Sequence, residues 1–150
     1  MTLTEQIKDL KSRCDYSSIT DLVPYAKLIG IETSMVGDQL ISGLKFLNSN
    51  IGNPAIPALH GGVLAGFMET AALLHLIWEN EPAKIPKVID FSIDYLRPAV
   101  AASTYSNCSI VRLGNRVALC DIFIWQDDMK QPIAKARVHF LMSENLPIGN

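Results

Sequence analysis

A single acidic residue, Glu69, lies inside a predominantly apolar segment that runs from Val63 to Trp78. No lysine or arginine stands within ten positions of it in the sequence. An unpaired buried charge either destabilises the fold or has a shifted pKa that favours its neutral form. Such carboxylates are more common at functional sites than elsewhere in proteins. Glu69 is therefore a candidate general base or nucleophile, and the sequence leaves both roles open.

Two glycines, Gly61 and Gly62, stand at the expected N-terminus of the helix that carries Glu69. The first N–H groups of a helix have no partners within it and lie at the positive end of its dipole. Such groups can polarise a carbonyl and hold a developing oxyanion. The alternative is that the glycines only permit a tight turn into the helix.

Small residues line the helix face that leads to Glu69, namely Gly62, Ala65 and Gly66. They leave room for a ligand or for tight packing of the helix on a sheet, and the carboxylate on the same face favours the ligand.

The spacing of these groups predicts a site shared by two chains. Glu69 follows Gly61 by eight residues, which is about 12 Å along a helix. One scissile bond cannot touch both groups of the same helix. If both act on one substrate, a two-fold dimer must bring them together.

The elements that position these residues follow from hydrophobic periodicity and turn signals. Pro24 lies early in the second predicted helix, and Pro82 and Pro86 lie in the loop that leaves the apolar helix. The hairpin signals predict an antiparallel sheet of about six strands that wraps one long central helix, hence an α+β fold. In order, we expect helices over 3–13 and 19–28, strands over 29–36 and 39–47, a loop over 48–59, the helix over 61–79, and strands over 89–95, 102–113, 116–125 and 133–142.

Alternation along the later strands predicts which of their side chains are buried. The first strand alternates apolar and polar residues, with Ile89, Phe91, Ile93 and Tyr95 on its apolar face. The last strand places Ala134, Ala136, Val138 and Phe140 on one face. Cys108 and Cys120 are expected to be buried structural thiols.

Composition excludes several classes of function. The chain has 150 residues and a formal net charge of −2, which suits one domain over 1–150, with a helical N-terminal segment over 1–28. It has no run of lysine or arginine, so we expect no nucleic-acid partner. The three scattered histidines and three cysteines lack metal-ligand spacing, so no metal is expected. The N-terminus lacks the pattern of a signal peptide and the apolar segment is short for a membrane span, which predicts a cytoplasmic protein.

The chain resembles the hotdog-fold acyl-CoA thioesterases of the PaaI type over roughly residues 28–143. The resemblance rests on His60-Gly61-Gly62, on the carboxylate nine positions after His60, and on the strand Ser92-Ile93-Asp94-Tyr95-Leu96-Arg97-Pro98-Ala99. It implies a sheet wrapped around the central helix, dimers that often pair into tetramers, and hydrolysis of acyl-CoA without a cofactor. The family's carboxylate is usually Asp, and Glu occurs in some 4-hydroxybenzoyl-CoA thioesterases.

The resemblance also implies roles for individual residues. Glu69 would activate water or attack the thioester carbonyl, Gly61 would donate its N–H to the thioester oxygen, and His60 would orient the loop. The family's Asn or Gln lies six positions before the histidine, where this chain has Pro54, so Asn53 is the candidate. The remaining predicted substrate-binding residues are Gly62 and Thr70 near the thioester and Arg97, Arg112 and Arg116 for the phosphates of coenzyme A.

The sequence leaves two alternatives to this function. A hotdog dehydratase or hydratase pairs a histidine with the helix carboxylate or places Asp and His in the preceding loop, and residues 48–59 contain neither. A non-catalytic acyl-CoA-binding protein would keep the fold without turnover. It is suggested by the displaced Asn53 and by Val88 and Leu73, which stand where the family often has a hydroxyl.

Overall fold

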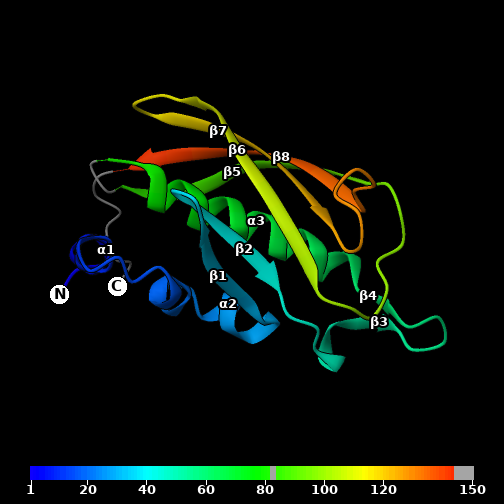
Figure 1. Ribbon diagram of the computed structural model, residues 1–150. Coiled ribbons are helices and arrows are strands. Elements are labelled where there is room, and N and C mark those ends of the chain that lie inside the picture. The colour runs from blue at the N-terminus through cyan, green and yellow to red at the C-terminus, as the bar shows by residue number, and fades with distance from the viewer. Residues whose placement is uncertain (82–83, 144–150) are drawn as a thin grey trace, which may run out of the picture.

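One antiparallel sheet of six strands curves around a single long helix, α3 (Gly61–Glu79), in the computed structural model (Figure 1). The structure describes residues 1–81 and 84–143. The strand order β1-β2-β6-β7-β8-β5 confirms the predicted α+β hotdog fold. The strands are β1 (Ile31–Val36), β2 (Gln39–Leu44), β5 (Ile85–Tyr95), β6 (Thr104–Leu113), β7 (Val117–Trp125) and β8 (Ala134–Ser143).

Helix α3 is buried around most of its circumference, as its apolar composition predicts. It packs on β2, β5, β6 and β7 of the sheet and on helix α2. Phe67, Met68, Leu74 and Leu76 are fully buried and form the centre of the core. Within the described ranges, α3 is also the one helix long and apolar enough to cross a membrane, and 56% of that window is buried in the fold. The core helix of a folded domain meets the same criterion.

The N-terminal segment differs from the expected pair of helices. Helix α1 (Leu3–Ser12) begins at Thr2 with a capping box to Glu5. The second predicted helix, 19–28, is in fact a 3₁₀ helix, η1 (Ser17–Leu22), followed by α2 (Pro24–Ile29). Proline pushes the residue before it out of the helical region, and Val23 is accordingly extended. Pro24 therefore begins a new helix instead of continuing the first.

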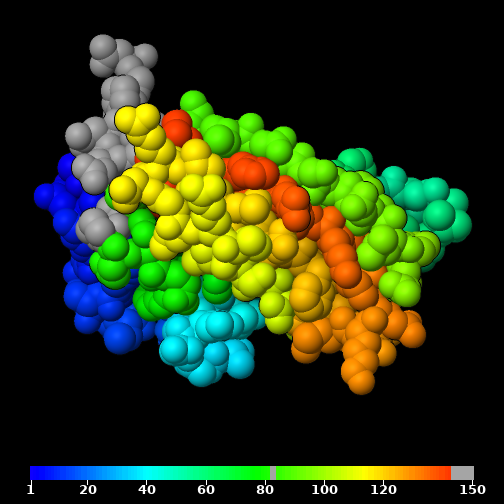
Figure 2. All heavy atoms as spheres, turned by 90° about the horizontal axis from the view of Figure 1, so that it is seen from above, coloured from blue at the N-terminus to red at the C-terminus, as the bar shows by residue number. Residues whose placement is uncertain are grey.

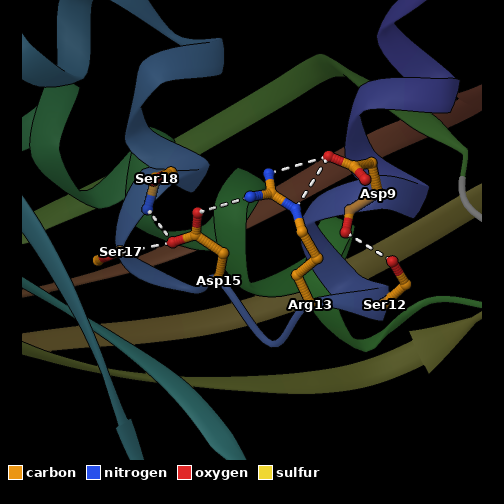
Figure 3. Close-up of polar contacts among 6 residues, drawn as sticks. All are labelled: Asp9, Ser12, Arg13, Asp15, Ser17 and Ser18. Atoms are coloured by element: carbon orange, nitrogen blue, oxygen red, sulfur yellow. Dashed lines mark hydrogen bonds and ion pairs between the residues drawn. The ribbon is translucent and has the colours of Figure 1, made fainter.

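Arg13 joins α1 to η1 through two carboxylates (Figure 3). Its guanidinium lies 2.9 Å from the Asp9 carboxylate and 3.9 Å from that of Asp15. Asp15 in turn accepts from the Ser18 N–H and the Ser17 hydroxyl at the start of η1. Hydrogen bonding by the Ser18 side chain is the main reason that the pKa of Asp15 lies below its ordinary value of 3.8.

The first hairpin has the predicted turn, and the loop after it contains more structure than expected. Strands β1 and β2 pair antiparallel around Gly37 and Asp38, and Gly37 has a positive φ of 64°. Strand β2 ends at Leu44, three residues before the predicted end. The predicted loop 48–59 contains a 3₁₀ turn, η2 (Asn48–Asn50), and a two-stranded ribbon of β3 (Ile51–Asn53) and β4 (Ala58–Leu59).

The prediction that Pro86 lies in a loop is wrong, because Pro86 pairs with Met142 within β5. Strand β5 is at the edge of the sheet, where a missing N–H is tolerated. The register shifts between Val88 and Asp90, and Ile89 at this bulge is 52% exposed. A bulge reverses the side chain that it contains, so Ile89 does not share the half-buried face of Phe91 and Ile93. Pro82 lies outside the described residues.

The remaining strands bury the side chains that their alternation predicts. Ala134, Ala136, Val138 and Phe140 of β8 are all buried. Cys108 and Cys120 are buried as expected. The hydrogen bond between their sulfurs, together with burial, raises the pKa of the Cys108 thiol far above its ordinary value, which fits a structural pair. Figure 2 shows the face of the sheet that points away from α3, and no described helix lies over it in this view.

Candidate active site

The N-terminus of α3 is capped by the imidazole of His60. Its Nδ1 accepts the Gly62 N–H at 2.9 Å. Since Nδ1 accepts, the proton of the neutral ring is on Nε2. The Gly62 N–H thus lacks a partner within the helix, as predicted, but the side chain of the capping residue His60 binds it. Among the described residues no acceptor reaches the Gly61 N–H, because a first helical residue has no carbonyl to bond within the helix.

Gly61 is fixed from the other side by Tyr95, at the end of β5. The Tyr95 hydroxyl donates to the Gly61 carbonyl at 2.6 Å. A Cβ built on Gly61 would lie 3.4 Å from the phenol ring, which is ordinary contact. The hydrogen bond holds the Gly61–Gly62 peptide in place and leaves the Gly61 N–H free. Sequence reasoning treated Tyr95 as pocket or core, and its 52% exposure excludes the core.

Asn50 at the end of η2 and Gly52 in β3 hold His60. The His60 N–H donates to the Asn50 carbonyl at 2.9 Å, and the buried Asn50 amide donates to the Ile29 carbonyl at 2.7 Å. Gly52 lies directly against His60, because a Cβ there would come within 2.8 Å of the His60 Cα. Sequence reasoning missed both Asn50 and Gly52. The only signal for them was a loop rich in Asn and Gly.

Asn53, the predicted amide of the site, is exposed at the end of β3. Its side-chain oxygen accepts from the Ala55 N–H at 3.0 Å, within its own turn. The structure therefore places Asn53 on the ribbon that also holds His60, and its oxygen serves the turn.

A cleft of about 350 Å³ opens beside Gly61. Arg97 lines it, and one guanidinium nitrogen of Arg97 donates to the Pro132 carbonyl at 2.8 Å. The other predicted arginines, Arg112 and Arg116, are exposed on the β6–β7 hairpin. Figure 1 shows this hairpin at the opposite end of the sheet from β3 and β4, so one chain does not bring these two arginines to Gly61.

Glu69 lies two turns further along α3, where it is half-buried. In the part of the chain that the structure describes, its carboxylate has no hydrogen-bond or ion-pair partner. The described residues that line the cleft beside Gly61 do not include it. Thr70, the next predicted contact, is 7% exposed. The structure of one chain thus keeps the acid and the free helix N–H apart, as their spacing predicts.

The small residues before Glu69 accommodate rings of the protein itself. The His60 ring lies beside Gly62, where a Cβ would come within 2.8 Å of it. The Tyr25 phenol of α2 lies over Gly66, with its oxygen 2.5 Å from the Cβ position. Packing therefore explains two of these small residues, and the space that they leave is occupied in a single chain. Across the described residues, no group of three or more His, Cys, Asp or Glu is arranged to bind a metal.

Comparison with known proteins places this arrangement in a family. A sequence model described as "Thioesterase superfamily" matches residues 57–133, slightly more than half of the chain, and this match includes His60, Gly61, Glu69 and β5. The chain belongs to the thioesterase superfamily. The fold and the family together identify it as a hotdog thioester hydrolase, and they do not favour the non-catalytic or dehydratase readings.

Individual proteins that are similar to this thioesterase agree with the family assignment. The medium/long-chain acyl-CoA thioesterase YigI of Salmonella typhimurium is 29% identical over 121 residues, covering 71% of this chain and 77% of the relative. A crystal structure from Chromobacterium violaceum is 41% identical, with a TM-score of 0.76 over 95% of this chain and 99% of that one. A Bacillus halodurans protein solved with CoA has the same fold, with 18% identity and a TM-score of 0.70 over 95% of this chain and 94% of that one.

Proposed function

We propose that this thioesterase hydrolyses acyl-CoA thioesters at a site that two protomers share. The observation that carries the proposal is the pair of unpartnered groups on α3. Tyr95 binds the Gly61 carbonyl and His60 binds the Gly62 N–H. Among the described residues, the Gly61 N–H has no acceptor and the Glu69 carboxylate has no donor. These are the two groups that thioester hydrolysis requires.

Gly61 is the proposed electrophilic group. Its N–H lies at the positive end of the 19-residue helix α3. A thioester oxygen that accepts from this N–H becomes more negative as the carbonyl is attacked, so the interaction strengthens toward the transition state. His60 contributes by binding the neighbouring Gly62 N–H, which fixes the first helical turn, and Gly62 and Asn53 shape the same wall.

Glu69 is the proposed base or nucleophile. As a base, its carboxylate takes a proton from water while the water oxygen bonds to the thioester carbon. The carbon–sulfur bond then breaks, and the coenzyme A sulfur takes up a proton. As a nucleophile, Glu69 would itself bond to the carbon, the carbon–sulfur bond would break, and the sulfur would leave as the coenzyme A thiolate. Water would then hydrolyse the resulting anhydride. Both routes place the carboxylate against the same carbonyl, with Thr70 beside it on the helix.

A second copy of the chain is the proposed source of the missing half of each site. Gly61 and Glu69 are about 12 Å apart on a straight helix, so each would meet its counterpart from the partner protomer. Strand β5, whose Tyr95 holds Gly61, is an edge strand with one unpaired side next to the cleft. A dimer, or a dimer of dimers, built beside this edge would complete two sites at once.

Arginines would bind the phosphates of coenzyme A. Arg97 lines the cleft at Gly61 and keeps guanidinium N–H groups for a ligand, since an arginine has five and its contact with Pro132 uses one. Arg112 and Arg116 could serve a site only from another protomer, because their hairpin lies away from Gly61 of their own chain. The bound CoA of the Bacillus halodurans neighbour and the activity named for YigI support an acyl-CoA substrate. We further propose a cytoplasmic enzyme that uses no metal or cofactor.

The decisive experiment replaces the carboxylate. Glu69→Gln and Glu69→Ala should each lower kcat on short, medium, long and aromatic acyl-CoA by a factor on the order of 100 or more, since a positioned base contributes that much. Glu79→Gln is the matched control, because Glu79 ends the same helix and is exposed. Unchanged hydrolysis in both Glu69 variants would refute the proposal.

A further inference from the structure

The phenol of Tyr25 lies over the middle of α3, at a position where the sequence has a glycine. A Cβ built on Gly66 would lie 2.5 Å from the Tyr25 oxygen and 2.9 Å and 3.1 Å from two ring carbons. Glycine inside a helix is about 1 kcal/mol less favourable than alanine. Glycine is therefore required at position 66 because a side chain there would collide with the Tyr25 ring. We call this position on α3 the seat of the ring.

Packing explains the ring of Tyr25 but not its hydroxyl. Tyr25 is 42% exposed, and within the described ranges its hydroxyl has no hydrogen-bond partner. Phenylalanine would fill the same seat. A phenol oxygen that is held in place by its ring, and that bonds to no protein group, is available to water or to a ligand.

Glu69 lies close to Gly66 on the surface of α3. It lies three residues after Gly66, hence on the same helix face. Side chains in a helix lean toward its N-terminus and cover the preceding turn. The unpartnered Glu69 carboxylate therefore leans over the turn that contains Gly66, which is the turn that the Tyr25 ring contacts. Among the described residues, the two groups form no direct hydrogen bond with each other, so both remain available to a water molecule.

We propose that Tyr25 and Glu69 together hold the attacking water, a role that rests on the proposed function with Glu69 as base. The water donates one hydrogen to the Glu69 carboxylate and the other to the Tyr25 oxygen. Its lone pair then points at the thioester carbon presented by Gly61 of the partner protomer. As the carbon–oxygen bond forms, Glu69 takes the first proton. The carbon–sulfur bond then breaks, and Glu69 returns this proton to the leaving sulfur. Tyr25 thus supplies the hydroxyl that Leu73 and Val88 do not.

The test separates the hydroxyl from the ring. Tyr25→Phe keeps the ring on Gly66, so the melting temperature should stay the same while kcat falls about 10- to 100-fold, with KM nearly unchanged. Hydroxylamine, an acceptor that needs no positioned water, should restore much of the thioester cleavage in this variant. Tyr16→Phe is the matched control, since Tyr16 is also exposed in the N-terminal segment.

A second variant tests the seat itself. Gly66→Ala must displace the Tyr25 hydroxyl, so it should lower kcat to a similar extent, and the double variant should be no worse than either single one. Full hydrolysis by Tyr25→Phe beside an inactive Glu69→Gln would overturn the role of Tyr25 and leave the proposed function intact. An active Glu69→Gln would overturn both.

Discussion

At the scale of single residues, the geometry around Gly61 allows the role of its backbone N–H to be tested apart from the role of its missing side chain. His60 before it is already extended, with φ −62° and ψ 130°, which is the conformation that a following proline requires. The first helical position tolerates proline, because its N–H has no partner within the helix. A Cβ on Gly61 meets Tyr95 only at 3.4 Å.

Gly61→Pro should therefore keep the fold and lose the reaction. Removing one oxyanion donor costs a factor on the order of 100 to 1,000 in kcat, and circular dichroism should show an intact helix. Gly61→Ala keeps the N–H and should stay close to the parent. Equal turnover of the proline and alanine variants would exclude the Gly61 N–H as the electrophilic group.

A second prediction at this scale concerns Gly52. A Cβ there would press on the His60 backbone at 2.8 Å, so Gly52→Ala should lower the free energy of unfolding by about 1–3 kcal/mol and should also reduce kcat. Gly43→Ala is the matched control, because a Cβ on Gly43 meets nothing closer than 3.7 Å. Chemical denaturation measures the free energy of unfolding of both variants. Equal stability of the two would contradict the close packing inferred for Gly52.

At the scale of elements, the N-terminal helix begins with a charged cap whose strength depends on pH. The Thr2 backbone N–H donates to the Glu5 carboxylate at 2.7 Å. This hydrogen bond is the main reason that the pKa of Glu5 lies below its ordinary value of 4.5. Because the pKa is lowered on folding, the cap stabilises the protein above the unfolded value and loses this contribution as the pH falls through the folded value.

Glu5→Gln should show this dependence directly. At pH 7 the parent should have the higher denaturation midpoint, and the difference should vanish as the pH falls below the lowered pKa of Glu5. Glu32→Gln, at an exposed position of β1, should show no such convergence. A constant difference between parent and Glu5→Gln down to low pH would show that the charge of Glu5 does not carry the cap.

At the scale of the whole molecule, the proposed sharing of each site by two protomers predicts complementation between inactive subunits. Glu69→Gln and Gly61→Pro remove different halves of each site. A mixed dimer contains one site with both wild-type groups and one with neither. Random mixing should therefore restore about a quarter of the parent activity. If mixed subunits that have exchanged remain inactive, each site lies within one protomer.

Hairpin signals and the periodicity of apolar residues were sufficient to predict the antiparallel sheet, the buried helix α3, and the face of β8 that carries Val138. It also marked Glu69 and Gly61, because an unpaired acid and a glycine at a helix start are visible within one segment. These features depend on neighbours a few positions away, so local patterns contain them.

Only the tertiary structure decided which groups remain free. It showed that His60 occupies the Gly62 N–H, that Gly52 and Asn50 hold His60, and that Tyr25 rests on Gly66 from a helix 41 positions earlier. It also moved Pro86 into an edge strand and divided the second predicted helix at Pro24. Each of these outcomes depends on contacts between segments distant in the sequence, and the free energy of such contacts is determined by packing that no local pattern records.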